Sequence, residues 1–142
     1  MKLSIASDHA GVEMKALIKE YIESLGHEVE DKGPFETASV DYPDYAKLAC
    51  HDVLEGKADS AICICGTGIG MSMACNKIRG IRAALCSDTV SAKFTRLHNN
   101  ANVLCLGARI IGVELAKAIV DEFLNNDFEG GRHLNRINKL ED

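Results

Sequence analysis

Short apolar runs alternate with amphipathic stretches along the whole chain, and this alternation constrains the fold more than any other feature. The apolar runs of strand length cover residues 3–7, 60–65, 81–86 and 103–106. A weaker run over 27–31 carries alternating acids, which suits a strand at a sheet edge. Amphipathic spacing after these runs predicts helices over 11–25, 42–55, 88–97 and 113–125, with a further helix opening after the glycines at 66–70.

Five strand–helix repeats predict an α/β class protein, a three-layer doubly wound (Rossmann/flavodoxin-like) fold with a five-stranded parallel sheet. After Gly130 we expect a C-terminal helical tail that reaches Asp142. The chain has 142 residues, the usual size of one domain, so we expect a single domain over 1–142. For the order of the strands we assume the flavodoxin-like 2-1-3-4-5.

Composition argues against several kinds of partner. The chain has 16 Lys and Arg against 21 Asp and Glu, a formal net charge of −5, which disfavours nucleic acid and membrane surfaces. No apolar run approaches the ~20 residues of a membrane span, and residues 1–5 lead into a strand without a signal-peptide core. We therefore expect a cytoplasmic protein.

The six cysteines do not have the spacing of a metal site. Cys63, Cys65, Cys86 and Cys105 lie in apolar runs, where a free thiol behaves as a small hydrophobic group. There is no C-x-x-C pair, and Cys63-x-Cys65 has no second pair to complete a tetrahedral zinc site. We expect reduced thiols and no metal.

In doubly wound sheets, ligands bind beyond the carboxyl ends of the strands, where the strand order reverses. Here that point lies between the first and third strands, whose following loops are residues 7–11 and 65–70. In the second loop Gly66, Gly68 and Gly70 precede a helix, so its N–H groups could hold an anion or simply form a tight turn. Cys65 lies at the helix N-terminus, where a thiolate is favoured, although it could equally be one more buried cysteine.

Other candidate residues have similar alternatives. Asp8 and His9 follow the first strand and could bind a hydroxyl or a phosphate, but Asp8 could also be only a helix cap. Arg132 and Arg136 are four residues apart and could clamp a phosphate if the tail is helical, or could be solvated charges. His98 could be a titrating acid or a C-terminal cap.

Together, six ordered motifs resemble the type B ribose-5-phosphate isomerases, and more broadly the sugar-phosphate isomerases that include the galactose-6-phosphate isomerase subunits. The motifs are SDHAG at 7–11, DYPDYA at 41–46, CGTGIG at 65–70, HNNAN at 98–102, LGAR at 106–109 and GRH at 131–133. They extend over essentially the whole chain. The resemblance implies an aldose–ketose isomerase that forms an enediolate and needs no metal and no cofactor.

The resemblance also implies roles for individual residues. Cys65 would be the base that moves a proton between C2 and C1, because Cys75 occupies the region where some members have a glutamate. Thr67 and His98 would open the furanose ring. The remaining residues would contact hydroxyls (Asp8, Tyr42, Asn99), the enediolate oxygen (Gly66, Gly68, Ile69, Gly70) and the phosphate (His9, Arg109, Arg132, Arg136).

The expected reaction interconverts ribose 5-phosphate and ribulose 5-phosphate, and a six-carbon substrate such as allose or galactose 6-phosphate is the alternative. Two other classes stay open: a phosphate-binding module without chemistry, and a thiol-redox protein, which the i, i+2 spacing of Cys63 and Cys65 disfavours. The resemblance implies a homodimer or a dimer of dimers. Topology agrees, because a ten-residue helix of about 15 Å separates His98 from the edge that carries Cys65, so we expect active sites shared between chains.

Overall fold

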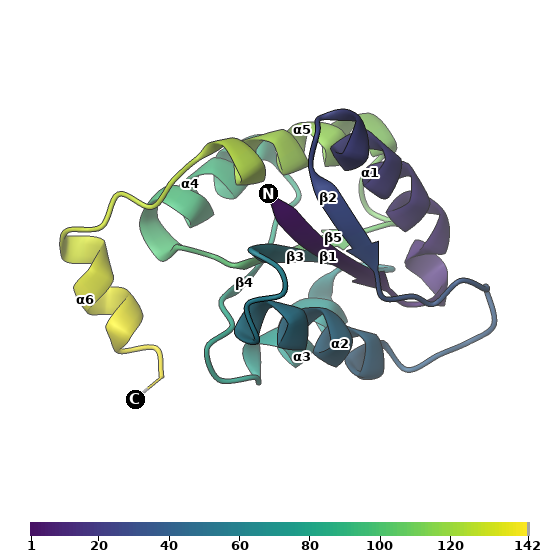
Figure 1. Cartoon of the computed structure of the whole chain (residues 1–142), viewed down its shortest axis with the longest axis horizontal. Helices are drawn as coiled ribbons and strands as arrows, with labels where there is room; N and C mark the ends of the chain where they lie inside the picture. Colours follow the sequence, from purple (N-terminus) through teal and green to yellow (C-terminus); the bar gives the residue numbers. More distant parts are fainter. Residues whose placement is uncertain (142) are drawn as a thin grey trace.

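The computed structural model describes residues 1–141, which form three layers with the sheet between two layers of helices (Figure 1). The strands are β1 (Lys2–Ser7), β2 (Glu28–Asp31), β3 (Ser60–Cys65), β4 (Ala83–Leu85) and β5 (Val103–Gly107). The helices are the 3-10 turn η1 (His9–Gly11) and α1 (Val12–Ser24), α2 (Tyr42–Leu54), α3 (Ile69–Asn76), α4 (Thr89–Asn99), α5 (Val113–Asn125) and α6 (Arg132–Asn138). α1, α4 and α5 cover one face of the sheet, and α2 and α3 cover the other (Figure 1).

The strands are all parallel, in the order β2-β1-β3-β5-β4, so the assumed order was wrong for the last two strands. The physical reason lies in their side chains. All five residues of β5 are buried, whereas the three-residue β4 exposes Leu85, so the fully apolar strand takes the inner position and the short one the edge. β1 and β3 remain neighbours, and the reversal of strand order between them is where it was expected.

The sheet separates two cores. Side chains alternate along β3, so Ile62 and Ile64 pack toward α1 and α5, while Cys63 and Cys65 pack toward α2 and α3. All six cysteines are free and buried, which confirms the expectation of reduced thiols. Contact with the thiols of Cys50 and Cys75, followed by burial, raises the pKa of Cys63, as suits a structural residue.

The predicted helices are all present, with ends shifted by a few residues. The side chain of Asp88 caps α4 by accepting a hydrogen bond of 2.7 Å from the Ser91 N–H, and the helix runs to Asn99. The tail forms the expected helix α6, which projects from the body of the molecule beside α4 (Figure 1); Asp142, the last residue of the predicted tail, lies outside the described residues. No helix within residues 1–141 is long and apolar enough to cross a membrane.

Candidate active site

The glycine loop at residues 66–70 joins β3 to α3 at the carboxyl edge of the sheet. Gly68 has a φ of 78°, and a Cβ there would lie 2.9 Å from the Leu106 carbonyl carbon, so both conformation and space require glycine. α3 begins at Ile69, whose N–H donates to Thr67 Oγ1 over 3.2 Å, and the N–H groups of its first turn, which have no partner within the helix, lie at this edge. The expectation that the loop opens a helix is therefore confirmed.

Cys65 is the last residue of β3 and is 5% exposed. The N–H of Gly68 donates a hydrogen bond to its Sγ over 3.2 Å. This donor and the N-terminus of α3 both place positive partial charge beside the sulfur. Cys63 is fully buried two residues earlier, so Cys65 is the thiol of this strand that the loop contacts.

Asp8 and His9 lie beside the end of β3, because the Asp8 N–H donates to the Ile64 carbonyl over 3.0 Å. Asp8 Oδ1 caps η1 by accepting from the Ala10 and Gly11 N–H groups at 2.9 and 3.2 Å, and Oδ2 takes no part in the cap. The Val40 N–H donates to His9 Nδ1 at 3.2 Å. That bond assigns the proton of a neutral His9 ring to Nε2, the nitrogen that remains for a ligand.

Tyr42 and Arg109 lie directly against the glycine loop. A Cβ on Gly70 would stand 2.8 Å from the Tyr42 ring, and one on Gly66 would stand 3.3 Å from Arg109 Nη1. The Arg109 N–H also donates to the Gly66 carbonyl over 2.9 Å. The structure thus gathers one group of predicted residues, which we call the Cys65 cluster: Asp8, His9, Tyr42, Cys65, Gly66, Thr67, Gly68, Ile69, Gly70 and Arg109.

A buried lysine fixes the loop that leads into this cluster. Lys15 is 2% exposed, and its Nζ donates to Asp31 Oδ1 at 2.6 Å and to the Pro34 carbonyl at 2.7 Å. The segment it holds continues to Val40, which bonds His9. Lys15 therefore links the core of the fold to the position of the His9 ring.

A second group of residues lies where α4 ends and α6 begins, and we call it the His98 cluster. It comprises the predicted residues His98, Asn99, Arg132 and Arg136 together with Glu129 and His133, which were not predicted. The imidazoles of His98 and His133 are stacked, with centroids 4.3 Å apart and an interplanar angle of 12°. A cavity of about 250 Å³ adjoins them, lined also by Asn99 and Arg136.

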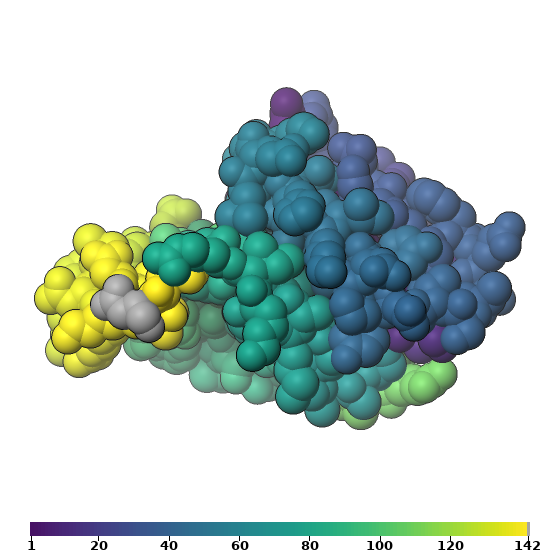
Figure 2. All heavy atoms as spheres, turned by 90° about the horizontal axis from the view of Figure 1, so that it is seen from below, coloured from purple at the N-terminus to yellow at the C-terminus, as the bar shows by residue number. Residues whose placement is uncertain are grey.

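Both arginines of this cluster are exposed, on a helix that stands out from the body of the molecule (Figure 2). Desolvation, followed by the charges of His98 and Arg132, lowers the pKa of the His133 imidazole. The lowered pKa favours the neutral form of the His133 ring.

The two clusters lie at opposite ends of the sheet. Asn102, shortly after α4, bonds through its backbone to Arg82 and Ala61, at the amino ends of β4 and β3. Cys65 is at the other end of β3, and a six-residue strand spans about 16 Å. Within one chain, the structure does not bring the residues of the His98 cluster to Cys65.

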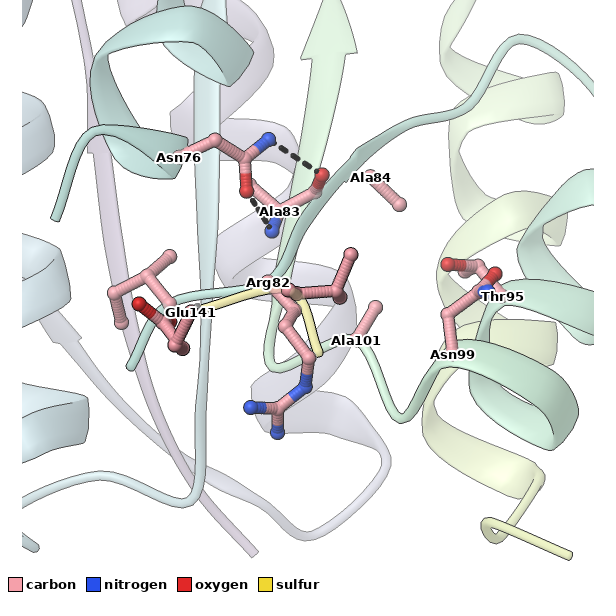
Figure 3. A pocket seen from close by; sticks show the side chains of 10 residues that line it. Asn76, Arg82, Ala83, Ala84, Thr95, Asn99, Ala101 and Glu141 are labelled. Carbon is pink, nitrogen blue, oxygen red and sulfur yellow. Dashed lines mark hydrogen bonds between the residues drawn. The ribbon is translucent and has the colours of Figure 1, made fainter. Parts of the chain in front are cut away.

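A further cavity belongs to neither cluster as a whole. It measures about 500 Å³ and lies along the edge strand β4, between Asn76, Thr95, Asn99 and the C-terminal segment at Glu141 (Figure 3). Two hydrogen bonds join the Asn76 amide to the Ala83 backbone, at 2.9 and 2.8 Å. Asn99 is the single predicted site residue in its lining, so the cavity gives Cys65 no enclosed pocket.

Sequence reasoning assigned no role to Glu129 or His133. His133 belongs to a quoted motif, and its spacing of four residues from Glu129 could have suggested a pair. Their approach to His98, by contrast, depends on the packing of the tail beside α4, including a 3.0 Å bond from the Glu129 N–H to the Leu97 carbonyl. No local pattern contains that contact.

Comparison with known proteins matches residues 3–140 to the family model described as Ribose/Galactose Isomerase. The chain is 45% identical to the ribose-5-phosphate isomerase B of Escherichia coli (strain K12) over 139 residues, 98% of this chain and 93% of the relative. A Clostridium thermocellum ribose-5-phosphate isomerase B is similar in structure, with a TM-score of 0.98, 45% identity and coverage of 99% and 95% of the two chains. The Mycoplasma genitalium enzyme with bound ribulose-5-phosphate has a TM-score of 0.94 and 44% identity, covering 98% and 93%.

Proposed function

The chain belongs to the ribose/galactose isomerase family, and on that premise we propose that it interconverts ribose 5-phosphate and ribulose 5-phosphate. One observation carries the proposal: a cysteine at the reversal point of the sheet receives an N–H donor from a glycine loop that opens a helix. The ribulose-5-phosphate complex of the similar Mycoplasma genitalium enzyme supports the choice of substrate.

In the proposed reaction, the Cys65 thiolate removes the proton from C2 of the open-chain aldose and returns it to C1, while the O2 proton moves to O1. The intermediate enediolate carries negative charge next to C1 and C2. N–H groups of residues 66–70 would face that charge, and each preorganised donor would lower the activation free energy by about 3–4 kcal/mol. Charge that develops only during the reaction makes this contribution specific to the transition state.

Ring opening precedes that step. His98 would donate a proton to the ring oxygen and accept one from the C1 hydroxyl, assisted by Thr67. Asp8, through its free Oδ2, would hold substrate hydroxyls together with Tyr42 and Asn99. His9, Arg109, Arg132 and Arg136 would surround the phosphate.

These roles require two copies of the chain. The separation of about 16 Å between the ends of β3 exceeds what a five-carbon sugar phosphate can bridge between base and ring-opening acid. We propose a homodimer, alone or paired again as a dimer of dimers, in which Cys65 of one copy faces His98 of the other. We also propose a cytoplasmic location, because free buried thiols suit a reducing compartment.

Subunit mixing tests the shared site. Cys65→Ala and His98→Ala proteins, each inactive, would be mixed, dissociated and reassembled. A mixed dimer then has one site with both lesions and one with neither, so random pairing should restore up to about a quarter of wild-type activity. Confirmed subunit exchange without any return of activity would show that the sites are not shared.

Substrate comparison tests the reaction itself. We expect kcat/KM to be highest for ribose 5-phosphate when it is measured beside allose 6-phosphate and galactose 6-phosphate. A higher kcat/KM for a six-carbon sugar phosphate than for ribose 5-phosphate would show that the alternative substrate is the preferred one. No turnover of all three by the folded protein would leave a binding module without chemistry.

A further inference from the structure

We propose that His98, Glu129 and His133 form a binding site for a borderline divalent transition metal such as Zn²⁺, and that the bound ion inhibits the enzyme. The metal site stands on geometry alone. The inhibition rests on the proposed function, because it assumes that His98 opens the sugar ring.

The distances are those of ligands around a common ion. Glu129 Oε1 lies 3.9 Å from His98 Nε2, and Oε2 lies 3.8 Å from His133 Nε2. These separations are too long for hydrogen bonds. Two ligands at about 2.0–2.2 Å from one ion stand about 3.4 Å apart in a tetrahedron, so small movements of the side chains complete the geometry. Each of the three residues offers a ligand atom within 4.8 Å of the others.

Three separate segments hold these ligands in place before any metal arrives. His98 lies in the last turn of α4 and contacts Phe94, with ring centroids 5.0 Å apart. Glu129 is tied to the end of α4 through the Leu97 carbonyl, and the His133 N–H donates to Gly130 over 3.2 Å. Stacking keeps the two imidazoles side by side, and both Nε2 atoms approach the same carboxylate. Because the stacked rings are nearly parallel and an imidazole binds a metal in its own plane, at least one ring must turn about its Cβ–Cγ bond when the ion binds. A preformed arrangement of this kind reduces the entropy lost on binding.

The donor set selects the class of metal. Two imidazole nitrogens with one carboxylate suit Zn²⁺, Ni²⁺ or Cu²⁺, whereas Mg²⁺ and Ca²⁺ prefer oxygen ligands. The neighbouring cavity of about 250 Å³ leaves room for water to complete the coordination. The exposed guanidinium groups of Arg132 and Arg136 oppose a cation, so we expect the ion to exchange readily and a chelator to remove it.

The bound ion would occupy His98 Nε2 and prevent that nitrogen from exchanging a proton with the sugar. Metal and substrate would then compete for the same group. We expect Zn²⁺ to raise KM for ribose 5-phosphate at unchanged kcat, and a chelator to reverse the effect.

The direct test measures Zn²⁺ affinity by competition with a chromophoric chelator, in wild type, Glu129→Gln and Asp127→Asn. Asp127→Asn is the matched control. Asp127 is two residues before Glu129, its side chain is exposed and lies outside the cluster, and the substitution removes the same negative charge. We expect affinity at least about tenfold lower in Glu129→Gln and nearly unchanged in Asp127→Asn. Asp127→Asn should also keep the metal-free isomerase activity, whereas Glu129→Gln is judged on its Zn²⁺ affinity alone, because Glu129 lies beside His98.

Cys65 is the competing ligand, because thiolates bind zinc strongly. Cys65→Ser should therefore still bind Zn²⁺, and the Co²⁺ complex of wild type should lack a thiolate charge-transfer band. Equal affinity in wild type and Glu129→Gln, equal losses in the two acid variants, or binding that disappears in Cys65→Ser would each overturn the site. Activity in the presence of chelator is read separately: its absence would count against the proposed function, while the affinities still decide the metal site.

Discussion

The two clusters differ in how they are held. Backbone N–H groups of Asp8, Gly68 and Arg109 bond the Cys65 cluster to the carboxyl end of β3 and the glycine that follows it, and a buried ion pair fixes the segment leading to the cluster. The His98 cluster consists of side chains at the end of α4, on α6 and in the segment before α6, and two of them are exposed arginines on the projecting α6 (Figure 2). This chain therefore builds its candidate base into the core and presents two of its candidate phosphate contacts, Arg132 and Arg136, on an exposed helix.

The largest expected effect is on catalysis at the rigid cluster. Cys65→Ala should lower kcat about a hundredfold to ten-thousandfold, because the base acts at carbon and water replaces it poorly. Phosphate binding and the fold should remain, since none of the proposed phosphate contacts is made by the Cys65 thiol. Steady-state kinetics and the Kd for inorganic phosphate check this.

Chemical modification provides the control for that variant. Iodoacetamide should inactivate wild type, and the substrate should protect it. Cys65 is 5% exposed and its sulfur accepts the Gly68 N–H, whereas the other five cysteines are at most 2% exposed and should react slowly. Near-normal turnover by Cys65→Ala would show that another group is the base.

The next effect is on stability and concerns the support of the same cluster. Lys15→Met should lower the free energy of unfolding by about 3 kcal/mol, because it leaves the Asp31 carboxylate of a buried ion pair without its partner. Denaturant unfolding measures the loss. Lys19→Met is the matched control, since the Lys19–Glu23 pair is exposed and should contribute less than about 1 kcal/mol. Equal losses in the two variants would mean that burial of Lys15 adds nothing.

At the outward cluster the effect should be on substrate binding with little change in stability. Arg136→Ala and Arg132→Ala should each raise KM about tenfold to a hundredfold, because each charge-assisted contact to a phosphate contributes about 1.5–3 kcal/mol. The free energy of unfolding should change by less than about 0.5 kcal/mol, as for other exposed residues. The KM for unphosphorylated ribose should rise less. Equal increases in KM for ribose and ribose 5-phosphate would show that the arginines do not bind the phosphate.

The smallest effect concerns the cap of the helix that carries His98. Hydrogen bonds from the Ser91 N–H and hydroxyl lower the pKa of Asp88 below its usual value. A lowered pKa in the folded state means that the stabilisation is present above the unfolded pKa of about 3.9 and is lost as the pH falls through the folded value. Asp88→Ala should therefore melt slightly below wild type at pH 7, and the two melting temperatures should converge in acid.

Asp41→Ala is the control for this cap. Asp41 precedes α2 in the same position, but its side chain makes no capping hydrogen bond. Its melting temperature should follow that of wild type at each pH. A pH-dependent difference as large as that of Asp88→Ala would assign the effect to helix dipoles in general rather than to the Ser91 contacts.

Local sequence patterns were sufficient for the elements and for half of the candidate site. The unbroken apolar run at 60–65 predicts a buried central strand, and the glycines after it predict the loop that contacts Cys65. The loops after β1 and β3 meet because carboxyl ends of neighbouring parallel strands share an edge. That inference needs only periodicity and one rule of topology.

Tertiary structure alone decided the strand order and the approach of Glu129 and His133 to His98. β4 and β5 are both short and apolar, and only competition for the interior, which the fully buried β5 wins, distinguishes their positions. Glu129 and His133 reach His98 because the tail returns to the end of α4 across more than thirty residues of chain. Secondary structure follows from short-range spacing, which the sequence states directly. Contacts between distant segments depend on how whole elements exclude water together, and no local pattern contains that information.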